Sequence, residues 1–150
     1  MPKDIAIYYA TMTGNSELVA QRAHDAAKAA GWNSTLHNLC DAKPDELASN
    51  AQIALFVVST WGDGEPPSDA EDFFGALGTE TPDLSAMRYA VFGLGDSDYE
   101  LFNGFARNLD QRLSELGGKT YMARVEADRE FDDTYAQWEP TFIEAINGLA

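Results

Sequence analysis

The chain has 150 residues, of which 45% are hydrophobic and 11% aromatic, a composition that fits one packed domain and excludes a disordered chain. Its net charge of −15, from 25 acidic and 10 basic side chains, argues against nucleic acids and anionic membrane surfaces as partners. Apolar runs such as Ala54 to Val58 are too short to cross a membrane, so we expect no membrane insertion.

The first half of the chain alternates between strand and helix patterns. Asp4–Tyr9 predicts a buried strand, and small apolar residues at helical spacing predict a helix over Asn15–Ala30 that Gly31 ends. Asn33–Asn38 alternates and is partly polar, which indicates a strand near an edge of the sheet. Gln52–Ser59 is almost entirely apolar and predicts a fully buried strand.

The same alternation continues in the second half. A short helix over Ala70–Leu77 precedes a buried strand at Tyr89–Leu94. The next helix, over Phe102–Leu116, is stopped by two glycines, and a fifth strand is expected at Thr120–Val125. A last helix carries an apolar stripe over Trp138–Leu149, and Pro140 predicts that it starts or kinks near that residue.

Strands that alternate with helices and are continuously apolar predict a parallel sheet covered on both faces. The predicted fold class is therefore α/β, a three-layer, doubly wound, five-stranded parallel sheet of order 2-1-3-4-5, forming one domain over residues 1–150. In this arrangement a ligand binds at the carboxyl ends of the strands, so the loops after strands 1, 3 and 4 should carry the function.

The loop after the first strand has the composition of a phosphate site. Thr11, Thr13, Gly14, Asn15 and Ser16 lie where the first helix begins, so free backbone N–H groups, hydroxyls and the helix dipole can all face an anion. Ordinary N-capping explains one hydroxyl but not this density. No Gly-Lys-Ser/Thr sequence follows, so nucleotide hydrolysis is not expected.

The loops after strands 3 and 4 each carry an aromatic residue among glycines and acids. Trp61 and Tyr99 would meet at the mouth of the crevice and offer flat apolar faces to a planar ring. A ring with a phosphate tail is therefore the expected ligand. The two histidines, His24 and His37, stand apart in the sequence, and we predict neither a metal site nor a catalytic residue.

The motifs together resemble those of flavodoxins. The matching segments are Thr11-x-Thr13-Gly14-Asn15, Ser59-Thr60-Trp61-Gly62-Asp63-Gly64 and Phe92-Gly93-Leu94-Gly95-Asp96-Ser97-x-Tyr99. Three further segments look more like the FMN domains of diflavin reductases such as sulfite reductase and cytochrome P450 reductase: Gly64-Glu65-Pro66-Pro67, Tyr99-Glu100-x-Phe102-Asn103 and Arg124-Val125-Glu126-Ala127-Asp128. The length resembles that of short-chain flavodoxins.

This resemblance implies a flavodoxin-like fold and FMN as the cofactor. The phosphate would be bound by Thr11, Met12, Thr13, Gly14, Asn15 and Ser16. Trp61 and Tyr99 would flank the isoalloxazine ring, and Phe102 and Asn103 would close the site beside Tyr99. The polar edge of the ring would contact the backbone around Ser59, Thr60, Trp61, Gly62, Asp63, Gly64, Leu94, Gly95 and Asp96. Asp128 lies in a segment that approaches the flavin in some relatives.

The function implied is that of a low-potential one-electron carrier without turnover of its own. It would shuttle electrons as a cytoplasmic monomer between an NADPH-dependent flavin reductase and downstream acceptor proteins, and the acidic chain would favour basic surfaces on those redox partners. A single cysteine, Cys40, agrees with a reducing compartment. Two alternatives remain open: an FMN-dependent NAD(P)H:quinone oxidoreductase, and a flavodoxin-like interaction or accessory module.

Overall fold

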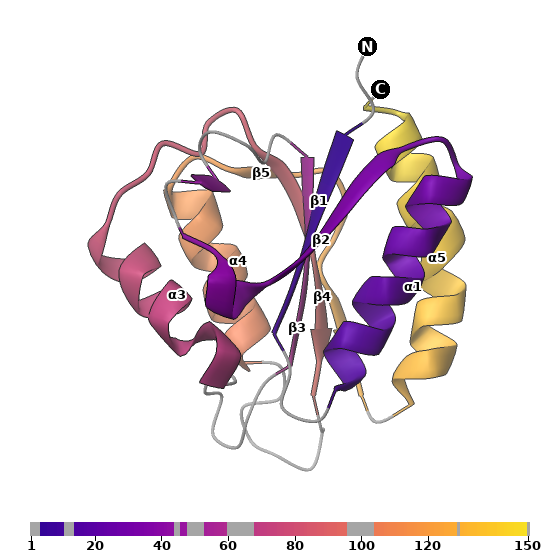
Figure 1. Cartoon of the computed structure of the whole chain (residues 1–150), viewed down its shortest axis with the longest axis horizontal. Coiled ribbons are helices and arrows are strands. Elements are labelled where there is room, and N and C mark those ends of the chain that lie inside the picture. The colour runs from indigo at the N-terminus through magenta and orange to yellow at the C-terminus, as the bar shows by residue number, and fades with distance from the viewer. Residues whose placement is uncertain are drawn as a thin grey trace.

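A parallel sheet lies between two pairs of helices, with α1 and α5 on one face and α3 and α4 on the other (Figure 1). The computed structural model describes residues 4–10, 14–43, 46–47, 53–59, 68–95, 104–128 and 130–149. The strands are β1 (Asp4–Ala10), β2 (Asn33–Asn38), β3 (Ile53–Ser59), β4 (Arg88–Leu94), β5 (Lys119–Thr120) and β6 (Val125–Ala127). The helices are α1 (Asn15–Ala29), the 3-10 turn η1 (Leu39–Asp41), α3 (Ser68–Thr79), α4 (Gly104–Glu115) and α5 (Phe131–Asn147).

The strand order is β2-β1-β3-β4-β5, with all pairs parallel, which confirms the predicted fold class and order. The central strands β3 and β4 are buried along almost their whole length, because helices cover both of their faces. The edge strand β2 alternates between exposed and half-buried residues, as its polar sequence predicts.

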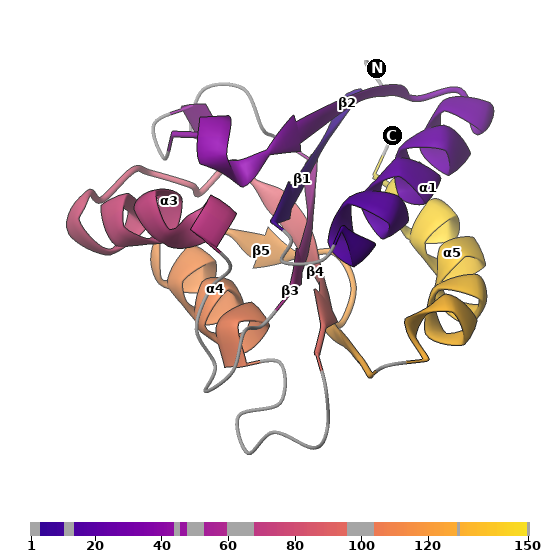
Figure 2. The ribbon, with the colours of Figure 1, turned by 60° about the horizontal axis from the view of Figure 1, so that its bottom comes forward.

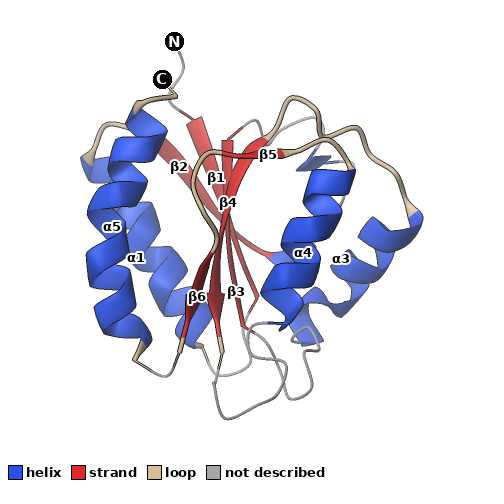
Figure 3. Cartoon of the chain, turned by 180° about the vertical axis from the view of Figure 1, so that it is seen from behind, coloured by secondary structure: helices blue, strands red, loops and turns tan. Residues whose placement is uncertain are grey.

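The predicted fifth strand is divided into two pieces (Figure 3). Thr120 pairs with Tyr89 and Val125 pairs with Phe92, so five positions on one side correspond to three on β4, and two extra residues must bulge out. Tyr121 still donates its N–H to the Tyr89 carbonyl, but its hydroxyl reaches the Ala54 carbonyl, 3.1 Å away, across the sheet. The prediction of one continuous strand over Thr120–Val125 was therefore wrong in this detail.

A glycine ends α1, as the sequence predicts. Gly31 has φ of 93°, and the N–H groups of Gly31 and Trp32 donate to the carbonyls of Lys28 and Ala27, a Schellman motif that ends α1. The last helix begins at Phe131 and contains Pro140 in its interior, so a start near Pro140 is wrong, and a kink there stays a prediction. Before Pro140, Tyr135 and Trp138 of this helix lie edge-on against Phe92 of β4.

Two hydrophobic clusters fill the space between the layers. One lies under α3 and α4 and is centred on Phe56, Phe73 and Phe105. The other lies under α1 and α5 and contains Val19, Trp138 and Phe142 among its members. Within the described residues no helix is long and apolar enough to span a membrane.

Candidate functional site

The carboxyl ends of four strands meet at one edge of the sheet. The register places Ala10 of β1 beside Val58, Ser59 of β3 beside Leu94, and Leu94 of β4 beside Ala127 of β6. Turning this end forward shows the start of α1 beside the ends of β3 and β4 (Figure 2). The three loops that the sequence predicts to be functional leave the sheet from these positions.

The start of α1 has the geometry of an anion site. Gly14, just before the helix, has φ of 90°, a left-handed conformation that glycine adopts without steric cost. The helical hydrogen bonds begin with the Leu18 N–H donating to the Gly14 carbonyl, so the N–H groups of Asn15, Ser16 and Glu17 have no acceptor within the helix. These N–H groups and the positive end of the helix dipole favour a bound phosphate.

A buried hydrogen bond joins two of the predicted loops. The hydroxyls of Ser16, in the first turn of α1, and Ser59, the last residue of β3, lie 2.5 Å apart. Ser16 is fully buried and Ser59 is only 9% exposed, so this bond is shielded from water. It fixes the turn that the sequence predicts to bind a phosphate relative to the end of β3. The sequence shows both residues but not their contact, because 43 positions separate them.

The strand end of β6 carries Asp128 into the same region. The Gly95 N–H donates to the Ala127 carbonyl at 2.9 Å, so Asp128 follows directly beside the point where β4 ends. The sequence indicates a role for Asp128 only through its resemblance to the diflavin reductases. The pairing of β6 with β4 gives that prediction a structural position at the candidate site.

An ion-pair network holds β6 against α4. Arg124 lies 2.6 Å from Asp110 and 3.2 Å from Glu126, and Arg107 lies 2.6 Å from Glu126. The Tyr89 hydroxyl donates to the Asp110 carboxylate at 2.6 Å. α4 begins at Gly104, just after the third predicted loop, and β6 ends just before Asp128. The network therefore holds together two elements that border the candidate site. No sequence pattern indicated these contacts, because the partners lie on different elements.

Burial and hydrogen bonds shift the pKa values of two groups in this network. The hydrogen bond from Arg107, with smaller contributions from Arg124, lowers the pKa of Glu126 below its usual value. Burial, followed by the hydrogen bond to Asp110, raises the pKa of Tyr89. Both groups therefore keep the protonation state that the network requires near neutral pH: an ionised Glu126 and a neutral Tyr89.

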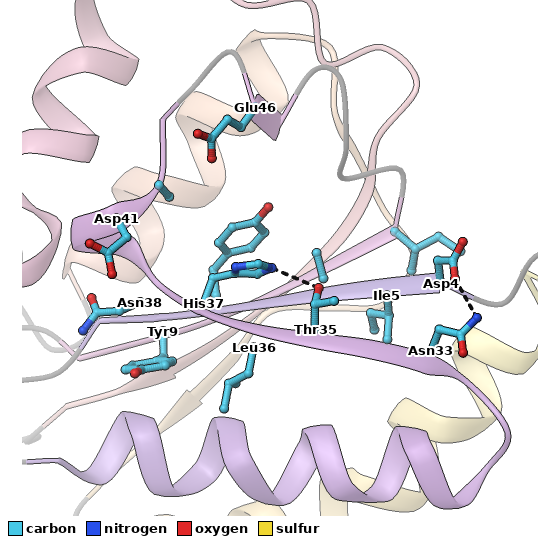
Figure 4. A pocket seen from close by; sticks show the side chains of 14 residues that line it. Asp4, Ile5, Tyr9, Asn33, Thr35, Leu36, His37, Asn38, Asp41 and Glu46 are labelled. Atoms are coloured by element: carbon cyan, nitrogen blue, oxygen red, sulfur yellow. Dashed lines mark hydrogen bonds between the residues drawn. The ribbon is translucent and has the colours of Figure 1, made fainter.

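The structure describes seven of the predicted cofactor residues and brings them to this edge of the sheet: Gly14, Asn15, Ser16, Ser59, Leu94, Gly95 and Asp128. The other predicted residues lie outside the described residues, and their roles stay predictions: Thr11, Met12, Thr13, Thr60, Trp61, Gly62, Asp63, Gly64, Asp96, Tyr99, Phe102 and Asn103. A hollow of about 940 Å³ opens elsewhere, along β2, and none of the seven described cofactor residues lines it (Figure 4).

Comparison with known proteins agrees with the sequence motifs. Residues 7–138 match the model of the family described as flavodoxin. The chain is 37% identical over 146 residues to the sulfite reductase [NADPH] flavoprotein alpha-component of Bacillus subtilis, an alignment that covers 97% of this chain and 24% of that protein. The chain thus spans about a quarter of the length of the curated relatives it matches.

Solved structures give the same result for the fold. A flavodoxin from Pseudomonas aeruginosa, in a variant with one cysteine replaced by alanine, has a TM-score of 0.84 at 27% identity, covering 96% of this chain and 99% of its own. A short-chain flavodoxin associated with a non-canonical PDU bacterial microcompartment has a TM-score of 0.85 at 26% identity, covering 100% of this chain and 99% of its own. The resemblance inferred from the sequence motifs is confirmed.

Proposed function

Because the chain belongs to the flavodoxin family, whose cofactor is FMN as the sequence predicted, we propose that it is a low-potential one-electron carrier. Its donor is an NADPH-dependent flavin reductase and its acceptors are other redox proteins. Residues 1–150 act as a single flavodoxin-like domain in this proposal. The flavin supplies the redox chemistry, and the protein binds it, orients it and sets its potential.

One observation carries the proposal: the buried hydrogen bond between Ser16 and Ser59 holds the start of α1 against the end of β3. A phosphate on the N–H groups of Asn15 to Glu17 then lies next to the strand ends at Ser59 and Leu94. A phosphate tail and a ring stacked between Trp61 and Tyr99 require this proximity. Leu94 and Gly95 would present backbone groups to the polar edge of the ring.

The phosphate site uses neutral donors. The first turn of α1 carries Glu17 and no basic side chain, and Arg22, further along the helix, pairs with Asp132 of α5 at 3.0 Å. Hydroxyl and backbone N–H groups can hold a phosphate that stays in place, whereas phosphoryl transfer normally needs a cationic clamp. This chemistry favours a retained cofactor over a reacting nucleotide.

The direct test is the visible absorption spectrum of the purified chain. We expect a yellow protein that shows the visible absorption bands of an oxidised flavin. Upon denaturation it should release FMN and no FAD. FMN added to the apoprotein should quench tryptophan fluorescence, and Trp61→Phe should remove most of that quenching. Trp32→Phe is the matched control, because Trp32 is buried and its indole N–H donates to Asn147. Quenching that survives Trp61→Phe would contradict the stacked geometry.

A second test separates a carrier from an enzyme. With NADPH and a quinone, the FMN-loaded chain should show negligible turnover by itself, whereas rapid turnover would favour the quinone oxidoreductase alternative. When an NADPH-dependent flavin reductase is added, electrons should pass through the FMN-loaded chain to cytochrome c. An accessory module that only holds flavin would stay inactive in both assays.

The charge of the chain supports basic surfaces on its partners. A net charge of −15 attracts such surfaces over about one Debye length, roughly 10 Å at 0.1 M salt. The rate of reduction by the reductase should therefore fall steeply as salt is raised.

A monomeric state and a cytoplasmic location stay predictions, to be checked by light scattering and by cell fractionation.

A further inference from the structure

The hollow along β2 has a polar and acidic side that the proposed function does not use (Figure 4). His37 and Thr35 of β2 project toward the side on which Asp41 and Glu46 lie, while Leu36 and Tyr9 point toward α1. The hollow has a volume of about 940 Å³. Among the described residues, its lining contains acidic side chains and neither lysine nor arginine; Lys43 lines a neighbouring hollow instead.

Tyr8 lines this hollow and is buried, with a relative exposure of 5%. Its ring is stacked between His37, at a centroid distance of 5.1 Å, and Phe56, at 5.3 Å. Both faces of the ring are therefore covered, which leaves the edge that bears the hydroxyl to meet the hollow.

The hydroxyl of Tyr8 differs from those of the other described tyrosines. The hydroxyls of Tyr9, Tyr89, Tyr121 and Tyr135 each donate to a carbonyl or carboxylate, whereas that of Tyr8 has no hydrogen-bond partner among the described residues. Leaving a buried hydroxyl without a partner is costly, so such a group points to a ligand. The nearby Glu46 carboxylate acts on the same hydroxyl and, after burial, is the second cause of its raised pKa.

The remaining lining narrows the chemistry of that ligand. Half-buried Ala6, Ala42 and Ile53 provide an apolar surface beside the carboxylates. Among the described residues no group of three His, Cys, Asp or Glu side chains could hold a metal ion. An apolar surface beside a buried hydroxyl and two carboxylates matches a cationic head on a hydrocarbon stem.

We propose that this hollow binds an aliphatic organic cation, a protonated amine or guanidinium on a short hydrocarbon stem. The head donates hydrogen bonds to the Tyr8 hydroxyl and to the carboxylates of Glu46 and Asp41, and the stem packs on Ala42 and Ile53. Two sources share this chemistry: a free amine, and a lysine or arginine side chain that a partner protein presents at the open edge of β2.

NMR titration of the FMN-loaded chain with agmatine, in 0.1 M salt, tests the proposal. We expect saturable amide shifts concentrated at Thr35 to Asn38, Ala42 and Glu46, and none with 1-butanol, which offers the stem with a neutral hydroxyl in place of the cation. Tyr8→Phe and Glu46→Gln should each weaken binding about tenfold, because each removes a hydrogen bond to a charged group. Glu144→Gln removes the same charge from the exposed face of α5 and should change the affinity less than twofold.

Several outcomes would overturn the proposal. Shifts spread over all acidic residues, or equal weakening by Glu46→Gln and Glu144→Gln, would mean general attraction to the net charge. Unchanged affinity in Tyr8→Phe would remove the role of the hydroxyl. Unchanged flavin absorption in each variant shows that it is folded, and if Tyr8→Phe fails that check, Glu46→Gln decides by itself. Since the titration follows amide shifts, its result does not depend on whether electron transfer is observed.

A further arm distinguishes the two sources. A glycine- and serine-rich heptapeptide with one central arginine is compared with the same peptide carrying citrulline, its neutral isostere. Tighter binding of the arginine peptide than of agmatine would assign the site to a protein partner. Tighter binding of agmatine would assign it to a free amine. Equal binding of the arginine and citrulline peptides would contradict recognition of the cationic head.

Discussion

The hydroxyls of Ser16 and Ser59 form a buried hydrogen bond between the first turn of α1 and the last residue of β3. This contact links the loop predicted to bind the phosphate with the loop predicted to stack on the ring. Either serine by itself would be an ordinary polar residue at the end of an element. Their hydrogen bond holds the start of α1 against the end of β3.

Replacing one member of this pair should cost both stability and cofactor affinity. Ser16→Ala leaves the buried Ser59 hydroxyl without this partner and should lower the free energy of unfolding by about 1–2 kcal/mol. The double variant Ser16→Ala/Ser59→Ala should lose less than the sum of the single losses. Urea denaturation of the apoprotein measures stability, and flavin fluorescence measures the FMN dissociation constant. Ser114→Ala, on the exposed face of α4, should change neither; strict additivity of the two losses would exclude coupling.

Gly14 and Gly31 provide a matched pair at opposite ends of α1. Their φ angles are 90° and 93°, and a Cβ at either position would meet no atom of the described residues within 4 Å. Alanine should therefore cost about 1–2 kcal/mol of stability at each, because of backbone conformation and not of crowding. Only Gly14→Ala should also weaken FMN binding. Equal FMN affinity in the two variants would show that the turn at Gly14 does not shape the phosphate site.

Glu126 should contribute a pH-dependent part of the stability. Its pKa is lowered in the folded protein, mainly by Arg107, so the stabilisation is present above its unfolded pKa near 4.5 and is lost as pH falls through the folded value. Glu126→Gln should therefore be less stable than the parent at pH 7, by no more than about 1 kcal/mol, and the difference should shrink at pH 3. Denaturation at both pH values tests this, with Glu115→Gln as control. A difference that grows toward pH 3 would have the wrong sign.

Tyr8 should titrate far above an ordinary tyrosine. Burial, and then the charge of Glu46, raises its pKa to about 12. Its contribution to stability is complete below pH 10, the unfolded value, and is lost as pH rises through the folded value. The difference in tyrosinate absorption between the parent and Tyr8→Phe should show a midpoint near pH 12. A midpoint near pH 10 would mean that the hydroxyl is solvated.

Much of the architecture could be read from the chain itself. The apolar runs at Ile53–Ser59 and Arg88–Leu94 predict buried parallel strands because only strands covered on both faces need no polar side. Gly31 marks the end of α1 because the left-handed conformation that closes a helix favours glycine. These signals depend only on residues that are close in the sequence, so they can be interpreted without knowledge of the fold.

The predictions from sequence were wrong where contacts with distant residues determine the local structure. The strand predicted over Thr120–Val125 is split because Tyr121 and Arg124 find partners on β3 and α4, at Ala54 and Asp110. The last helix starts well before Pro140, and Tyr135, in the part that precedes the proline, packs on Phe92; of the two alternatives for Pro140 only the start is wrong. In both cases tertiary contacts override a local pattern.

By itself, the sequence determined the order of strands and helices and the chemistry of a ring with a phosphate tail, and it predicted the three loops that would carry the function, because residue type and spacing encode them directly. Only the tertiary structure paired Ser16 with Ser59, brought Asp128 beside Gly95, and left the Tyr8 hydroxyl facing a hollow. Those relationships join residues far apart in the chain, and spacing along a sequence carries no information about contacts that form when separate elements pack.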